Sequence, residues 1–297
     1  MANRLISNVL LFLLCICLPA HAFASGFRLG VINERADKPD QVLTQYAGLQ
    51  RYLERELASR GIAPVELVIA RDINEMVNFL VNDGVDAMLE GVMPTLLIRK
   101  RGADIDPALL VWRKGQRQYH SVFFVRRDSG IKTLDDLRGK SIVFESPRST
   151  SAYFVPRATL RAADIALGAA EDSNVANGSL RYVFAGSELN QAYWVQRGRA
   201  DAGAFNDGDW ERIPAGIRND LRIIHRTEPV LRWLFSVNPD IATPIREAVV
   251  DALLNAHGDE LGRSALLDAA RIKMFERLTD QDRENLSYWS DALDTSE

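Results

Sequence analysis

Three consecutive hydroxyl-bearing residues, Ser149, Thr150 and Ser151, carry the clearest chemistry in this sequence. They follow an apolar run at 141–144 that is typical of a strand, and they precede a stretch that favours a helix. The start of a helix presents backbone N–H groups without intrahelical partners, at the positive end of the helix dipole. Hydroxyls beside those groups can donate further hydrogen bonds, so the segment suits a small oxyanion. The alternative is that Ser149 or Thr150 only caps the helix.

Further polar residues stand at or shortly after the ends of strand-like runs, among them Glu90, Glu145, Glu188 and Asn206. In open α/β sheets, ligands bind beyond the carboxyl ends of the strands, so we expect these side chains near a ligand. A carboxylate at position 188 would repel an anion by roughly 1 kcal/mol at 4 Å in water, and by more once desolvated. The alternative for Glu188 is a purely local one, as the first-turn acid of a helix, where the dipole favours negative charge.

Signatures of catalysis and of nucleic-acid binding are missing from the sequence. Gly186-Ser187-Glu188 lacks the G-x-S-x-G pattern of a nucleophile elbow, and neither a phosphate-binding glycine loop nor a dinucleotide fingerprint is present. No spacing of His, Cys and Asp residues matches a metal site. The 36 basic and 40 acidic residues are interspersed and give a net charge of −4, without a basic patch for nucleic acid. We therefore expect no catalytic residue, no metal and no cofactor.

The N-terminus has the features of an export signal. A single positive charge at Arg4 precedes an apolar run at 9–18, and small residues follow as far as Ala24. The run is too short to cross a bilayer core as a helix. We expect residues 1–24 to be a cleavable signal peptide and the mature, soluble chain to begin at Ser25, with cleavage two residues earlier as the alternative. Both cysteines lie inside this segment, which leaves no thiol in the mature chain.

The rest of the chain alternates strand-like apolar runs with helical spacing, a pattern that predicts an α/β architecture with largely parallel sheets. Roughly 270 mature residues exceed the size at which a single core usually stops growing, so we expect two lobes. The tail at 239–293 shows helical patterns only. The expected strands are at 27–32, 65–70, 85–89, 109–112, 121–125, 141–144, 180–185, 202–205, 221–224 and 233–237.

Several motifs, taken in order, resemble the phosphate/phosphite/phosphonate-binding family of periplasmic ABC-transporter receptors. The similarity extends over nearly the whole mature chain, and the order of the motifs makes it more specific than any one of them. The motifs are Gly30-Val31, Tyr119-His-Ser121, 128–131, 134–140, Phe144, Ser149-Thr-Ser151, Pro156, 184–187, Val195, Gly198 and Asp201-Ala202.

The resemblance implies the clamshell of a type II periplasmic binding protein, with a ligand cleft between two α/β lobes. Lobe one would comprise residues 25–112 and 222–297, and lobe two residues 119–206. The hinge crossings would lie at 113–118 and 205–210, where a few residues absorb the dihedral change on closure.

The resemblance also implies roles for individual residues. Ser149, Thr150 and Ser151 match the turn that holds the anion, Tyr119 matches an aromatic position at the start of the second lobe, and Asn206 lies near a polar position that reads protonated ligand oxygens. Where the family usually has a histidine, this chain has Glu188. With Glu90 and Glu145 also near strand ends, the site is expected to disfavour ordinary alkylphosphonate. It would suit a neutral or protonated oxyacid, or a ligand with both an acidic and a basic group.

These features together predict a monomeric periplasmic solute-binding receptor for a phosphonate-, phosphite- or phosphate-like oxyanion. Such a receptor would deliver its ligand to the membrane permease of an ABC importer. One alternative is a periplasmic sensor that presents its ligand to a two-component histidine kinase. The other is a periplasmic enzyme on the same fold, for which the only motivation is the carboxylates at the strand ends.

Overall fold

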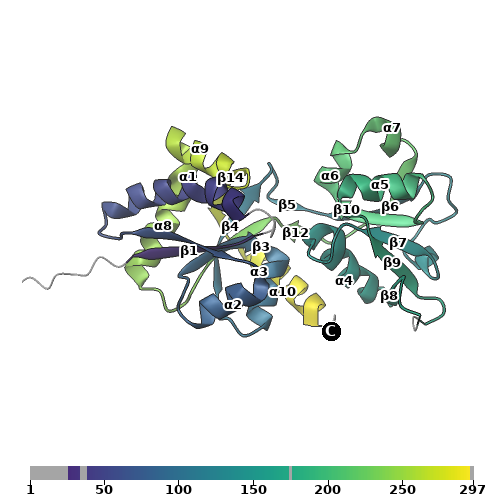
Figure 1. Cartoon of the computed structure of the whole chain (residues 1–297), viewed down its shortest axis with the longest axis horizontal. Coiled ribbons are helices and arrows are strands. Elements are labelled where there is room, and N and C mark those ends of the chain that lie inside the picture. The colour runs from purple at the N-terminus through teal and green to yellow at the C-terminus, as the bar shows by residue number, and fades with distance from the viewer. Residues whose placement is uncertain (1–25, 34–38, 174–175, 295–297) are drawn as a thin grey trace, which may run out of the picture.

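The structure is a computed structural model that describes residues 26–33, 39–173 and 176–294. The expected signal peptide at 1–24 and the expected mature start at Ser25 lie outside the described residues. Figure 1 shows two α/β lobes side by side, joined by a narrow connection, so the two-lobed α/β architecture expected from the sequence is confirmed. None of the helices within the described ranges is both long enough and apolar enough to span a membrane.

Six strands form the sheet of the first lobe: β1 (Phe27–Ile32), β2 (Val65–Ala70), β3 (Ala87–Gly91), β4 (Asp106–Arg113), β13 (Trp233–Val237) and β14 (Ile272–Arg277). They lie in the order β14-β4-β13-β3-β1-β2. β1 pairs in parallel with β2 and β3, whereas β13 and β14 run antiparallel to their neighbours. The sheet is therefore mixed, because the returning chain adds strands of opposite direction.

Helices cover both faces of this sheet. One face packs against α1 (Pro39–Ala58), α8 (Thr243–Asn255) and α9 (Glu260–Asp268), and the other against α2 (Ile73–Val81) and α3 (Val92–Lys100). The tail was expected to be entirely helical, and that expectation is wrong for β14. In β14 a register shift places the buried Ile272 and Phe275 three positions apart, and in the sequence that spacing is easily taken for part of a helix.

Six further strands form the sheet of the second lobe, in the order β11-β6-β10-β7-β9-β8. They are β6 (Ser121–Arg126), β7 (Ser141–Phe144), β8 (Leu167–Ala169), β9 (Leu180–Phe184), β10 (Ala202–Asn206) and β11 (Leu221–Arg226). One face packs against α5 (Glu188–Gln196), α6 (Asp207–Arg212) and α7 (Ala215–Arg218), and the other against α4 (Val155–Ala162). β7 pairs in parallel with both β9 and β10, so the carboxyl ends of these three strands meet at one edge.

Two short strands cross between the lobes as an antiparallel pair, β5 (Gln118–Tyr119) and β12 (Val230–Leu231). The expected second crossing at 205–210 is wrong, because those residues end β10 and begin α6 within the second lobe. The assignment of lobe one from residue 222 is also wrong for its first strand. β11 pairs with β6, and Leu221 packs in the core of the second lobe. The apolar pattern predicts that strand but does not indicate which sheet it extends.

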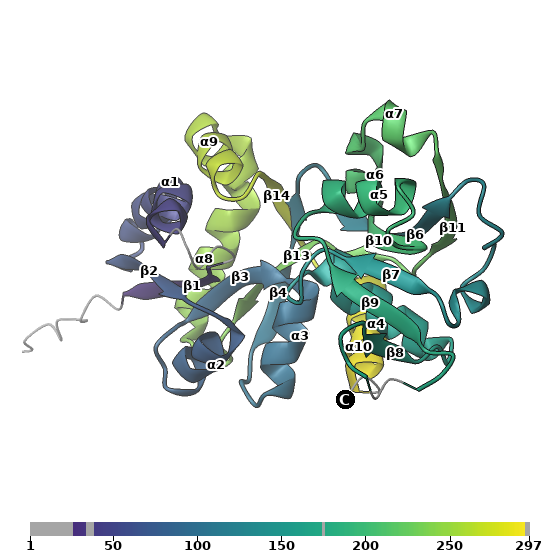
Figure 2. The same ribbon diagram turned by 45° about the vertical axis from the view of Figure 1, so that its right-hand side comes forward.

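The C-terminal helix α10 (Asp280–Asp294) ties the crossing to both lobes. It contacts α3 in the first lobe and lies beside α4 of the second, as Figure 2 shows. Trp289 Nε1 and Asn285 Nδ2 both donate to the carbonyl of Pro229, at 2.8 and 2.7 Å. Arg117, in the first crossing segment, donates to both carboxylate oxygens of Asp282. α10 therefore packs directly against the segment about which the lobes are joined.

Candidate ligand-binding site

The three hydroxyl residues occupy the start of a helix, as the sequence predicts. Ser149 is the N-cap of η2 (Thr150–Phe154), a single π-helical turn that continues directly into α4. Its hydroxyl accepts a hydrogen bond from Ala152 N at 3.2 Å, so Ser149 caps the helix. Ser149, Thr150 and Ser151 all remain half-exposed. The cap occupies the Ser149 hydroxyl, and the first N–H groups of a helix in general have no intrahelical partners.

Asn206 joins this turn to the next helix. It ends β10 and caps α6, where its Oδ1 accepts from Asp209 N at 2.9 Å. Its Nδ2 donates to Ser151 Oγ at 3.3 Å and to the Asp209 carboxylate. The Ser151 carbonyl accepts from Ser121 Oγ at 2.7 Å, which fixes the turn from the other side. Asn206, at 3% exposure, is therefore a buried link between the hydroxyl turn and Asp209.

The carboxylates of Glu145 and Asp209 lie within electrostatic range of Glu188 at this edge of the second lobe. Glu188 is the first residue of α5, as its local interpretation requires, and it is only half-exposed. Burial raises its pKa, and the charges of Glu145 and Asp209 raise the pKa further, while Lys114 lowers it. No group of three or more His, Cys, Asp or Glu side chains in the described part of the chain is arranged to hold a metal ion. Of these acids, Asp209 accepts hydrogen bonds from Asn206 Nδ2 and from the guanidinium of Arg212.

Two cations that the sequence analysis did not select lie at the lobe crossing. Lys114 occupies the turn after β4, and its φ of 53° is in the left-handed region. Arg232 lies between β12 and β13, is 7% exposed, and its guanidinium carbon sits 4.9 Å from the centre of the Tyr119 ring. Burial lowers the pKa of both, and in each case Asp209 opposes the effect. The sequence did not single out Arg232 because its apolar neighbours favour core packing. A cation beside each crossing segment could nevertheless have indicated a binding role.

The remaining two predicted residues have different surroundings. Tyr119 lies in β5 and is 3% exposed, and Arg232 covers one face of its ring. Glu90 lies in β3 of the first lobe, is 6% exposed, and accepts a hydrogen bond from Gly91 N at 2.6 Å. α3 starts directly after β3 and contacts η2, so Glu90 precedes the first-lobe helix that touches the hydroxyl turn. The structure thus brings Ser151, Asn206 and the acids together and leaves Tyr119 and Glu90 at their border.

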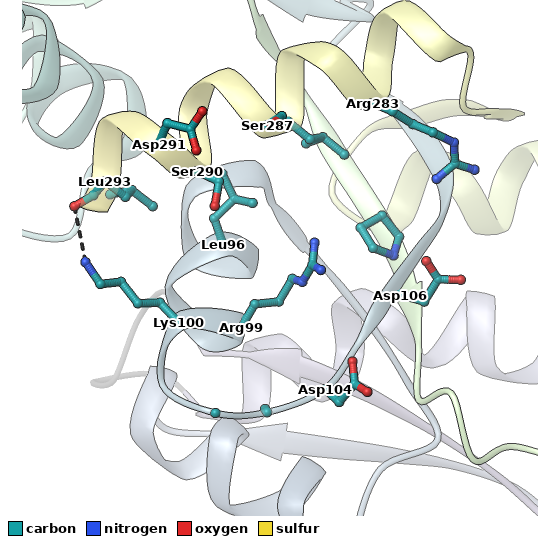
Figure 3. A pocket seen from close by; sticks show the side chains of 14 residues that line it. Leu96, Arg99, Lys100, Asp104, Asp106, Arg283, Ser287, Ser290, Asp291 and Leu293 are labelled. Atoms are coloured by element: carbon teal, nitrogen blue, oxygen red, sulfur yellow. Dashed lines mark hydrogen bonds between the residues drawn. The ribbon is translucent and has the colours of Figure 1, made fainter. Parts of the chain in front are cut away.

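A separate groove of about 700 Å³ lies between α3 and α10 (Figure 3). Arg99 and Lys100 of α3 line it from one side and Ser290 and Asp291 of α10 from the other. Lys100 points toward the end of α10, where its Nζ donates to the carbonyl of Leu293 at 3.3 Å. None of the residues selected from the sequence lines this groove. Its lining mixes cations and acids from α3, from residues 102–107 and from α10, and it includes no residue of the hydroxyl turn. The residues around the hydroxyl turn therefore remain the candidate site.

The raised pKa of Glu188 leads to a prediction about stability and pH. The folded protein keeps the Glu188 proton to a higher pH than the unfolded chain, so stability falls as pH rises from the ordinary glutamate pKa of 4.5 through the raised value. Glu188→Gln has no such proton to lose. We expect this variant to be more stable than the wild type above that window, with a flatter dependence of the unfolding free energy on pH, measured by urea denaturation between pH 4 and pH 7.

Glu284→Gln provides the matched control, because Glu284 is an exposed glutamate of α10. That substitution should leave the pH dependence of the wild type unchanged. A Glu188→Gln variant whose pH dependence equals that of the wild type would show that the carboxylate has no distinctive environment.

A protein-family model described as "ABC transporter, phosphonate, periplasmic substrate-binding protein" matches residues 36–283. The chain belongs to this family. The family resemblance found in the sequence is therefore confirmed. Membership makes the protein a periplasmic substrate-binding receptor, with a small-molecule substrate and a membrane permease as its partners.

Solved structures agree with the family assignment. The chain is 30% identical to XAC2383 from Xanthomonas citri, with a TM-score of 0.80, over 91% of this chain and 98% of that chain in a structure with a bound chloride ion. A second structure of XAC2383, bound to ATP, matches with the same identity and TM-score over 92% and 98%. PhnD1 from Prochlorococcus marinus, in complex with methylphosphonate, is 17% identical with a TM-score of 0.61 over 92% and 99%. The last similarity shows the common fold.

Proposed function

We propose that this receptor binds a small phosphorus oxyanion in the cleft at the lobe crossing and delivers it to an ABC importer. The observation that carries the proposal is the hydroxyl turn at Ser149–Ser151, which Asn206 ties to Asp209. Asp209 in turn lies within the electrostatic range of Lys114 and Arg232. Hydroxyl and N–H donors beside two cations form a suitable environment for an anion.

The chemistry of known ligands in related proteins supports an anion. XAC2383 has been solved with chloride and with ATP, and PhnD1 with methylphosphonate. All three ligands are negatively charged, although they differ greatly in size. Negative charge is the one ligand property that we carry over from these proteins to this chain.

The carboxylates narrow the class of oxyanion. Glu188, Glu145 and Asp209 would repel a fully ionised ligand, but each can accept a hydrogen bond from an acidic O–H or from an ammonium group. We therefore favour a ligand that carries a donor together with its negative charge. Hydrogen phosphite, a singly protonated phosphonate and an aminoalkylphosphonate all meet this condition.

Binding would be accompanied by closure of the lobes about the crossing strands β5 and β12. These strands form only a two-stranded pair, with Val230 opposite Tyr119 and Leu231 opposite Gln118. A few residues in short connecting strands are sufficient to absorb the dihedral change of a hinge.

A thermal-shift screen tests the proposed function. The protein is heated with chloride, phosphate, phosphite, methylphosphonate, aminomethylphosphonate, ATP and methanesulfonate, each with an uncharged solute of similar size as control. A ligand at 100 times its Kd adds about 2.7 kcal/mol of stability, or about 5 to 10 °C in Tm for a chain of this size. We expect phosphite or aminomethylphosphonate to give the largest shift. Stabilisation by methanesulfonate or by uncharged solutes alone would contradict the proposal.

A further inference from the structure

Buried polar atoms without partners are concentrated at the lobe crossing. Among the described residues, five buried side-chain atoms have no hydrogen-bond partner. Two of them, Gln116 Oε1 and Arg232 Nε, belong to the connecting segments, and a third, Trp112 Nε1, lies near the end of β4, just before the first segment. Buried polar groups in native proteins are nearly always paired, so such a concentration requires an explanation. A polar ligand that binds at the crossing would explain why the unpaired atoms lie there.

Arg232 is the most unusual of the three. Arg232 is 7% exposed, yet its Nε has no hydrogen-bond partner, and none of the ion pairs among the described residues involves its guanidinium. Its described contact is the face of the Tyr119 ring, which stabilises the charge without using any of its N–H donors. Arg113 lies nearby and adds like charge. A buried, unpaired cation of this kind is destabilising unless a further partner binds.

Lys114 provides a second cation at the crossing. It is half-buried in the turn that leads from β4 to the first crossing, and its backbone is fixed by a bond of 2.9 Å from its N–H to Arg271 O. Its ammonium forms no ion pair within the described part of the chain, although Asp209 and Glu188 both lie within electrostatic range. Asp209 therefore interacts electrostatically with both cations, which belong to opposite crossing segments.

We propose that Arg232 and Lys114 together bind the negatively charged group of the ligand, so that charge is recognised by the hinge segments themselves. This inference rests on the proposed function, which it deepens by locating the positive half of the site. The hydroxyl turn of the second lobe then orients the oxyanion, and the carboxylates contact its protonated or ammonium end. An anion between the two cations joins both crossing segments, which links occupancy of the site directly to the conformation of the hinge.

A purely structural role for Arg232 makes the opposite prediction about stability. If the stack on Tyr119 were its purpose, Arg232→Met would lower the Tm of the ligand-free protein. If the cation is held for a ligand, the same substitution removes an uncompensated buried charge. The ligand-free variant should then melt at the same temperature as the wild type or higher, while its affinity for an anion falls.

The test measures calorimetric affinities of the full chain for phosphite and aminomethylphosphonate, together with Tm without ligand. We expect Arg232→Met and Lys114→Met each to weaken binding by about 10- to 100-fold, the change that corresponds to loss of one hydrogen bond to a charged group. Lys140→Met is the control, because Lys140 is an exposed cation at the start of β7. It should bind within twofold of the wild type. Lys114→Met decides the matter if Arg232→Met does not fold.

The outcomes separate the inference from the proposed function. Wild-type binding that both variants retain within twofold would overturn the role of the hinge cations and leave the anion receptor intact. A wild type that binds no anion of the screen would overturn the proposed function, and the inference with it. Weakened binding with an unchanged or raised ligand-free Tm supports both.

Discussion

Replacing Ser149 and Thr150 together by alanine should weaken binding of the anionic ligand by about 3 to 6 kcal/mol while the protein remains folded. Each hydrogen bond to a charged group contributes about 1.5 to 3 kcal/mol, and the double variant removes two hydroxyl donors. The fold should lose only about 1 kcal/mol, because Ser149 also caps η2 through Ala152 N. Calorimetric titration with the ligand that gives the largest thermal shift measures the first effect, and urea denaturation the second.

The double variant Ser129→Ala with Thr133→Ala is a matched control. These two hydroxyls also belong to the second lobe and also form hydrogen bonds, to Arg126 O at 2.8 Å and to the Asp136 carboxylate at 3.1 Å. They lie in the loop after β6, away from the turn. The control should lose stability but keep its affinity. Equal affinities of the wild type and the Ser149/Thr150 variant would remove the hydroxyl turn from the site.

Trp289→Ala should lower the free energy of unfolding by about 3 to 5 kcal/mol, the range observed when a large buried aromatic side chain is truncated. Trp289 is 1% exposed and packs in a cluster that contains Leu231 of the crossing and Val155 of α4. Its indole also donates to Pro229 O at 2.8 Å. One substitution in α10 therefore removes contacts with both lobes and with the crossing. Urea denaturation measures the effect as a lower midpoint at constant slope.

Two further variants test the origin of that loss. Trp289→Phe keeps most of the apolar contact but removes the bond to Pro229, so it should cost clearly less than the alanine variant. Tyr288→Ala changes the neighbouring side chain, which is 48% exposed, and should alter stability only slightly. If Trp289→Ala were as mild as Tyr288→Ala, α10 would not hold the crossing.

Local patterns in the sequence predicted most strands and the hydroxyl turn correctly, because these depend on nearby residues. Ser149 caps its helix, and Ser151 contacts Asn206 although 55 positions separate them. That contact follows from a general property of parallel strands, whose carboxyl ends meet at one edge. The positions of Ser151 and Asn206 shortly after two predicted strands were therefore sufficient to infer that they lie close together.

The errors arose where long-range pairing decides the structure. The apolar residues of β11 predict a strand, but only its pairing with β6 assigns it to the second lobe and moves the second crossing to the region of β12. Arg232 was missed for a similar reason. Its sequence neighbours are apolar and buried, and its nearness to Asp209 depends on how the two lobes meet. No local pattern contains that information.

A crystal structure of the protein with the anion that gives the largest thermal shift tests the central claim most directly. The account predicts density for the anion in the cleft, with its oxygens within hydrogen-bond distance of the turn at 149–151 and of Lys114 or Arg232. The groove between α3 and α10 in Figure 3 is the competing location. Density in that groove, with an empty cleft, would contradict the account.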